Sequence, residues 1–253
     1  MTMVAEAPLP VGGEGTLLRE GEGALLREGD RLTRDEFERR YSAMPWVKKA
    51  ELIEGRVRMA SPVRIAEHSN PHGRIQTWIG TFEAETPGVL QGDNATVRLD
   101  AANEYQPDAC LIRRADVGGQ TRIGADGMLE GPPELVVEVA ASSVSTDRQA
   151  KRRVYERCGV GEYLLWDTEQ GRVDWWVRRA EGFVPLLPDD DGILRSEVFP
   201  GLWLDVPALL AGNMRRVFAV LREGLGSPGH AAYVASLAAA GSGSSASPQT
   251  ESP

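Results

Sequence analysis

The chain has 253 residues, 42% of them hydrophobic and 26% charged, a composition typical of a globular protein with a substantial core. Its net charge of −9 argues against a protein that coats nucleic acid through an overall positive surface. The sequence contains no apolar run of about eighteen residues and no secretory leader pattern in residues 1–10, so we expect a cytoplasmic protein without a membrane partner.

Composition divides the chain into three parts. Residues 1–32 hold a short duplicated Leu-Leu-Arg-Glu-Gly motif among glycines and glutamates, which predicts a flexible N-terminal arm. Residues 33–225 contain no Pro/Gly/Ser-rich linker and predict one main domain. Residues 226–253 form a C-terminal extension, and its end, residues 238–253, is rich in Gly, Ser and Ala and is expected to be disordered.

The first predicted elements of the main domain are a short helix, a hairpin and a longer helix. Thr33 followed by Glu36 is typical of a capping box at a helix start. Residues 50–54 and 56–59 flank Gly55 as a hairpin would. From residue 71 to residue 85, apolar side chains recur at helical spacing, and Pro87-Gly88 ends the pattern.

Short β-rich runs follow at residues 96–99, 109–112, 135–139 and 163–166. A helix-compatible segment, 147–158, lies between the last two and ends at a glycine, which predicts a right-handed strand–helix–strand crossover. A hairpin over 173–177 and 183–186 and a closing helix over 207–222 complete the domain. The order predicts an α/β fold with a central mixed sheet flanked by helices.

Two carboxylates lie on strands that can be neighbours in this sheet. Asp108 stands at the start of one strand, and Glu138 lies in a strand otherwise made of Leu and Val. Burying such an acid is costly unless it is paired or binds a metal. One or two carboxylates completed by water and phosphate oxygens suit Mg²⁺, or Mn²⁺. Taken singly, Asp108 is also compatible with a strand-end turn residue and Glu138 with a salt-bridged acid.

Lys151 follows Glu138 by one loop and lies early in the next predicted helix, where its amine could reach the same carboxylates. Metal, carboxylate and amine together suit phosphodiester hydrolysis, because the metal activates water and the lysine stabilises developing negative charge. Since Lys151 is one of several basic residues on this helix, a purely solvated charge is the alternative.

Two further residues are candidates for auxiliary roles. Histidine titrates near neutrality, so His68 or His72, which precede the helical pattern from Ile75 to Phe82, could act as a base or contact phosphate. Glu51 in the predicted hairpin could support the metal, although a solvent-facing acid is equally compatible with its position.

These residues resemble the Uma-type restriction endonuclease family of the PD-(D/E)XK nuclease superfamily. The resemblance covers residues 33–225 and includes a histidine at the position of His72. It implies a restriction-endonuclease-like core, a divalent metal and DNA as substrate. The motifs that carry it are Glu51-Leu52-Ile53-Glu54-Gly55, Ser61-Pro62, Pro107-Asp108, Glu138-Val139-Ala140, Asp147 with Lys151 and Tyr155, and Gly159-Val160-Gly161-Glu162-Tyr163.

The sequence departs from the superfamily signature at Ala140, where a lysine two residues after the acid is usual, so catalysis would depend on Lys151 reaching the site from the helix. The second hypothesis is therefore a non-catalytic domain of the same fold that binds nucleic acid or protein. In one version of this hypothesis the domain acts as a homodimer. A cysteine hydrolase using Cys158 is the third and weakest, because no base lies near it in the sequence.

Overall fold

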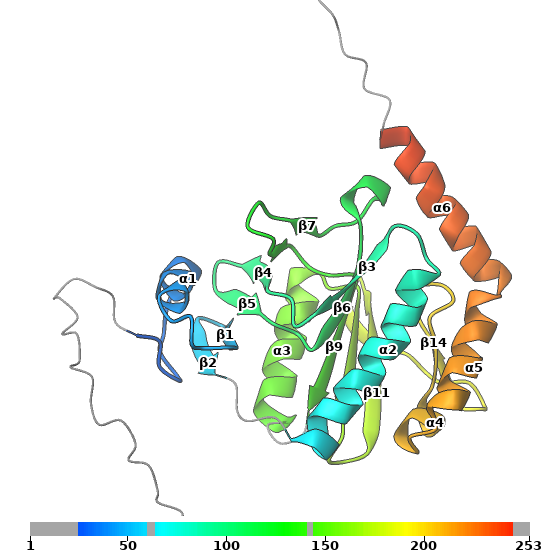
Figure 1. Ribbon diagram of the computed structural model, residues 1–253, viewed down its shortest axis with the longest axis horizontal. Helices are drawn as coiled ribbons and strands as arrows, with labels where there is room; N and C mark the ends of the chain where they lie inside the picture. The colour runs from blue at the N-terminus through cyan, green and yellow to red at the C-terminus, as the bar shows by residue number, and fades with distance from the viewer. Residues whose placement is uncertain (1–24, 60–63, 141–143, 245–253) are drawn as a thin grey trace, which may run out of the picture.

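The computed structural model describes residues 25–59, 64–140 and 144–244 (Figure 1). The helices in these ranges are α1 (Arg34–Ser42), α2 (Asn70–Ala84), α3 (Val144–Cys158), α4 (Val206–Leu210), α5 (Met214–Leu225) and α6 (Pro228–Ser244), with a π-helical turn at Ile65–Ser69 and a 3-10 turn at Ala115–Val117. The predictions for residues 1–24 and 245–253 lie outside the described residues.

The strands belong to two larger sheets and one hairpin. They are β1 (Ala50–Ile53), β2 (Arg56–Met59), β3 (Val89–Asp93), β4 (Val97–Asp100), β5 (Asn103–Tyr105), β6 (Ala109–Arg113), β7 (Arg122–Ile123), β8 (Leu129–Glu130), β9 (Leu135–Ala140), β10 (Glu162–Asp167), β11 (Arg172–Arg179), β12 (Gly182–Pro185), β13 (Ile193–Arg195) and β14 (Trp203–Asp205). The strand order is β12-β11-β10-β9-β6-β3 in the central sheet and β2-β1-β5-β4-β8-β7 in the second, while β13 pairs with β14.

Both larger sheets are mixed. In the central sheet β9 and β10 are parallel and are joined by α3, whereas β6 pairs antiparallel with β9. In the second sheet β4 and β8 are parallel and the other pairs are antiparallel. The α/β mixed-sheet fold and the strand–helix–strand crossover are therefore confirmed.

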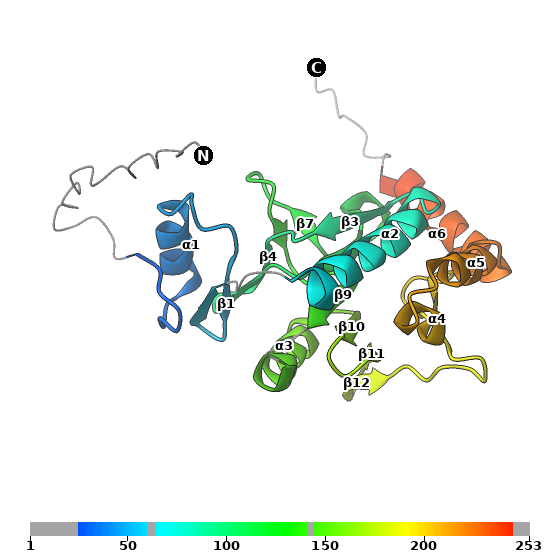
Figure 2. The same ribbon diagram turned by 60° about the horizontal axis from the view of Figure 1, so that its bottom comes forward.

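Alternation along β9 decides which helix each side chain meets. Leu135, Val137 and Val139 pack in the cluster that contains the buried face of α2. Val136 points the other way and packs with Val154 of α3. Figure 2 shows α2 and α3 on opposite sides of β9. Glu138 has the same parity as Val136, so its side chain faces α3.

The short helix, the hairpin at Gly55 and the long helix are confirmed as α1, β1–β2 and α2, and the Thr33 side chain accepts from the Glu36 amide as the capping box predicts. The single closing helix predicted over 207–222 is wrong. Gly212 adopts a left-handed φ of +74°, which ends α4, and the Asn213 side chain caps α5.

The two ends of the described chain are ordered further than their composition predicts. Leu26 is buried with Phe37 of α1, and the Gly29 amide donates to the Val57 carbonyl, so residues 25–32 pack against β2. At the other end, α6 continues to Ser244, within the segment for which disorder is predicted. Across the described ranges, no helix combines the length and apolar character needed to cross a bilayer.

Candidate active site

Asp108 and Glu138 lie side by side because β6 and β9 are neighbours. Ala109 pairs with Val137 in this antiparallel register, which places Asp108, just before β6, opposite Glu138. The Asp108 side chain is only 4% exposed, and its Oδ2 accepts a 2.8 Å hydrogen bond from the Val139 amide. The backbone of β9 therefore fixes the orientation of the Asp108 carboxylate.

Lys151 reaches the two strands from α3. Its Nζ lies 2.9 Å from Glu138 Oε1 and 3.0 Å from Glu51 Oε2, and all three side chains are about nine-tenths buried. Because α3 follows β9 and packs back on the sheet, Lys151 directly contacts the Glu138 carboxylate although the two residues are 13 positions apart. The structure thus brings together Asp108, Glu138 and Lys151, the three residues singled out from the sequence.

Glu51 lies in β1 of the second sheet and contacts Lys151 through its carboxylate. Its Oε1 accepts a 2.8 Å hydrogen bond from the Gln106 amide, and Lys151 Nζ contacts both carboxylate oxygens. In this arrangement Glu51 holds the amine of Lys151, a different position from the solvent-facing one that was the alternative for a hairpin acid. Its exposed side-chain fraction is 11%.

Tyr155 is a further contact of Glu138. Its hydroxyl donates a 2.7 Å hydrogen bond to Glu138 Oε1, the oxygen that Lys151 also approaches. Tyr155 lies one helical turn after Lys151, so both side chains project from the same face of α3. Its ring packs edge-to-face against Tyr105, which fixes the position of the hydroxyl.

Burial and crowding of charge shift the acid–base equilibria of the site. Burial, reinforced by the nearby Asp108 and Glu51 carboxylates and opposed by Lys151, raises the pKa of Glu138 to about 7. For Lys151, burial alone would lower the pKa, but the attraction of Glu138 and Glu51 outweighs it and holds the pKa well above the usual range. The site therefore combines a persistently charged amine with a carboxyl that ionises near neutral pH.

Lys49 and His68 complete the surroundings of Asp108. Lys49 Nζ lies 3.4 Å and His68 Nε2 3.5 Å from Asp108 Oδ1, and Lys49 also contacts Asn94 Oδ1 at 2.9 Å. Lys49 is not among the site residues predicted from the sequence. The signal was available, because Lys49 precedes Glu51 by two residues and alternation along an extended chain places both on one face.

His72 meets the site through the backbone. Its Nε2 lies 2.8 Å from the Asp108 carbonyl oxygen and 3.2 Å from Asp93 Oδ1, and Gln76 donates to the same Asp108 carbonyl. His72 therefore supports the chain that carries Asp108. Of the two histidines, His68 is the one whose ring approaches the Asp108 carboxylate.

The donor set suits a hard divalent cation. The contacts of Asp108 Oδ1 with Lys49 and His68, at 3.4 and 3.5 Å, are longer than the 2.8 Å hydrogen bond that Oδ2 accepts. Glu138 adds a second carboxylate from the neighbouring strand. Over the part of the chain that the structure describes, no group of three or more His, Cys, Asp or Glu side chains is arranged so that it could hold a metal ion. Magnesium sites built from one or two carboxylates, waters and substrate phosphates need no such group, so the residues present fit this kind of ion.

The cysteines do not form an alternative centre. Cys158 Sγ donates to Asp100 Oδ2 at 3.4 Å, and burial together with that carboxylate raises the pKa of the thiol to about 11. Burial raises the pKa of Cys110 to about 12. Since the thiolate is the nucleophilic form, neither residue is activated for hydrolysis.

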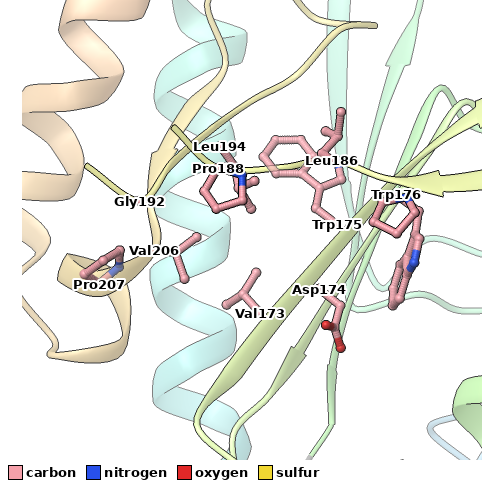
Figure 3. Close-up of a pocket in the computed structure, with 11 residues that line it drawn as sticks. Val173, Asp174, Trp175, Trp176, Leu186, Pro188, Gly192, Leu194, Val206 and Pro207 are labelled. Atoms are coloured by element: carbon pink, nitrogen blue, oxygen red, sulfur yellow. The ribbon is translucent and has the colours of Figure 1, made fainter. Parts of the chain in front are cut away.

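A cavity of about 410 Å³ lies elsewhere in the molecule, between β11, β13 and the start of α4 (Figure 3). Its walls are mainly apolar and include Val173, Trp175, Leu194 and Val206, while Asp174 supplies its ionisable group. None of the candidate catalytic residues lines it. The carboxylate–lysine cluster is therefore a separate feature from this pocket.

Comparison with known proteins points to a nuclease family. A crystal structure of a putative nuclease belonging to DUF820 from Anabaena variabilis ATCC 29413 shares the fold, with a TM-score of 0.54 and 15% identity, covering 71% of this chain and 98% of that one. No curated protein matches the chain. The family model described as "Uma2: Putative restriction endonuclease" matches residues 34–207, and the chain therefore belongs to the Uma2 family.

Proposed function

We propose that the chain is a divalent-metal-dependent endonuclease that hydrolyses DNA phosphodiester bonds. The observation that carries the proposal is the meeting of Asp108, Glu138 and Lys151 from two adjacent strands and a crossover helix. Membership of the Uma2 family supports the reaction class. Magnesium is the expected cation and manganese a substitute, because the available ligands are carboxylate oxygens.

Asp108 and Glu138 are the residues that would hold the cation. When bound, a divalent cation supplies Lewis-acid activation of phosphate and water. The hydrogen bond from the Val139 amide keeps Asp108 in one orientation, and those from Lys151 and Tyr155 do the same for Glu138. Such pre-positioning reduces the reorganisation that the site needs when substrate arrives.

Lys151 supplies positive charge where the attacked phosphate gains negative charge. Its pKa is held above the usual range, so the amine remains protonated over the whole neutral range. Two carboxylates compensate it in the absence of substrate, and a phosphate approaching Glu138 would compete for the same ammonium. Stabilisation of this kind by one preorganised group contributes about 10²–10³-fold to a rate.

The test is cleavage of supercoiled plasmid DNA with Mg²⁺ or Mn²⁺ by the wild-type chain, Asp108→Asn and Glu138→Gln. Both variants should lose cleavage while keeping the circular dichroism of the wild type. Glu169→Gln and Asp190→Asn remove a charge of the same type from exposed positions and should cleave normally. Unchanged cleavage in Asp108→Asn and Glu138→Gln would refute the assignment.

One observation favours a second candidate function, a non-catalytic nucleic-acid-binding or protein-binding domain. Lys151 is paired with both Glu138 and Glu51, so its charge is already neutralised within the protein. A domain that retained the fold for binding alone could keep this ion-paired cluster as a structural element. Binding of DNA by the wild-type chain without cleavage in either metal would favour this candidate.

A further inference from the structure

A tryptophan lies on the surface in the connection between α1 and β1. Trp46 is 62% exposed, whereas the other tryptophan side chains are buried or half-buried. Exposing so large an aromatic ring to water is unfavourable, because burial of a large apolar side chain is worth about 1.5–3 kcal/mol. The exposed ring of Trp46 is therefore available for contact with a partner.

The backbone holds Trp46 in this position. The Val47 amide donates to the Met44 carbonyl at 2.9 Å, which closes a turn with Pro45 and Trp46 at its two central positions. Met44 is buried against Leu26 and Phe37, and Val47 packs on the same cluster. The turn is thus anchored at both ends, and Trp46 is the residue that it presents to solvent.

The residues that follow this turn reach the candidate active site. Lys48 is exposed, and the next residue, Lys49, reaches Asp108 Oδ1 at 3.4 Å. Three residues of extended chain span at most about 11 Å, so the backbone of Trp46 lies within that reach of the backbone of Lys49. Ile65, which is 74% exposed, lies three residues before His68, whose ring also approaches this carboxylate.

We propose that Trp46 is a base-stacking platform for a single-stranded segment of DNA at the candidate active site, with Lys48 and Lys49 contacting its phosphates. The inference rests on the proposed nuclease function and narrows the substrate to DNA with an unstacked base beside the cut. An aromatic face next to two lysines matches the chemistry of a single strand, in which bases and phosphates alternate.

The overall charge of the protein limits the ways in which it can hold such a strand. At a net charge of −9 the whole surface does not attract phosphates, so affinity must come from local contacts. Stacking is such a contact, and it is available to an unpaired base but not to a base within an intact duplex. The lysines next to Trp46 supply the local positive charge.

The experiment compares binding of a fluorescein-labelled single-stranded oligonucleotide with binding of the duplex of the same sequence. Ca²⁺ replaces Mg²⁺, and a gel verifies that the probe stays intact. Trp46→Ala should weaken single-strand binding about tenfold, which corresponds to about 1.4 kcal/mol, and should change duplex binding less than twofold. Trp46→Phe should restore most of the affinity. Ile123→Ala, at a position 60% exposed in β7, is the control and should bind like the wild type.

Tryptophan fluorescence gives a second readout. Unlabelled single-stranded DNA should quench the emission of the wild type, and this quenching should disappear in Trp46→Ala. Equal single-strand affinity in Trp46→Ala and wild type would overturn the inference, as would loss of self-association in Trp46→Ala with DNA binding unchanged. If the wild type cleaves DNA while Trp46→Ala binds normally, the inference alone fails. If the wild type neither binds nor cleaves DNA, the proposed function fails with it.

Discussion

Lys151 Nζ contacts Glu138 Oε1 at 2.9 Å, although the two residues are 13 positions apart and belong to different elements. Glu138 lies in β9 and Lys151 in the following helix, α3. At the position two residues after Glu138, where the superfamily signature has lysine, the chain has Ala140, whose side chain has the same parity as Glu138 and also faces α3. A lysine at either position would therefore approach the same carboxylate.

Lys151 takes the place of the signature lysine, and its contribution to the reaction can be tested by substitution. Lys151→Met should reduce plasmid cleavage about 10²–10³-fold, because one preorganised charge at the reacting phosphate is lost. Arg153→Met, an exposed position on the same helix, is the control and should cleave like the wild type. Adding Ala140→Lys to Lys151→Met should restore part of the activity. Full cleavage by Lys151→Met would show that the amine has no part in the reaction.

The main features of the site follow from the sequence because each depends on a local rule. Alternation in a Leu/Val strand singles out Glu138 as a buried acid, and the helix after it brings Lys151 back to the same face. The partners of these residues depend on sheet order, which local rules do not give. That β1 lies beside β5, which ends just before Asp108, is a tertiary fact, and it places Glu51 and Lys49 at the site.

The break between α4 and α5 is another feature that local sequence rules do not predict. The sequence from 207 to 222 carries enough apolar residues for one amphipathic helix, and Gly212 is compatible with helix at a modest cost. Its left-handed conformation sends the chain in a new direction, so that α5 packs on α2. Packing against α2, rather than the local sequence alone, selects two helices over one.

Tyr155→Phe tests the hydrogen bond to Glu138. Removing the hydroxyl should lower the free energy of unfolding by about 1.5–3 kcal/mol, the range for hydrogen bonds to charged groups. It should also weaken Mn²⁺ binding, because Glu138 loses a donor that orients its carboxylate. Urea denaturation and titration calorimetry measure the two effects. Tyr233→Phe is the matched control, since the Tyr233 hydroxyl is buried without a hydrogen-bond partner in the described structure.

The pKa of Glu138 predicts how metal binding depends on pH. Below about 7 its carboxyl is protonated in the metal-free protein, so the cation must displace a proton. Apparent Mn²⁺ affinity should therefore weaken about tenfold for each pH unit below 7 and level off above it. Glu138→Gln should remove this dependence. Calorimetry in two buffers of different ionisation enthalpy should detect about one released proton at pH 6, and release of none would contradict the assignment.

Another buried acid, Glu104, lies in β5 and is not one of the candidate site residues. The Glu104 side chain is 3% exposed, and its Oε2 has no hydrogen-bond partner among the described residues. Burial, and then the neighbouring Glu38 carboxylate, raise the pKa of Glu104 to about 8, although Arg98 lies 3.9 Å away. At neutral pH the carboxyl is therefore mainly protonated and resembles an amide in shape and charge.

Glu104→Gln should reveal this proton in the pH dependence of stability. The folded pKa of about 8 lies above the unfolded value of 4.5, so the wild-type stabilisation from this group is complete below 4.5 and is lost as pH rises through 8. The variant carries no such group. Its free energy of unfolding in urea should match the wild type near pH 5 and exceed it increasingly up to about pH 9. A constant difference across this range would mean that Glu104 is ionised in the folded protein.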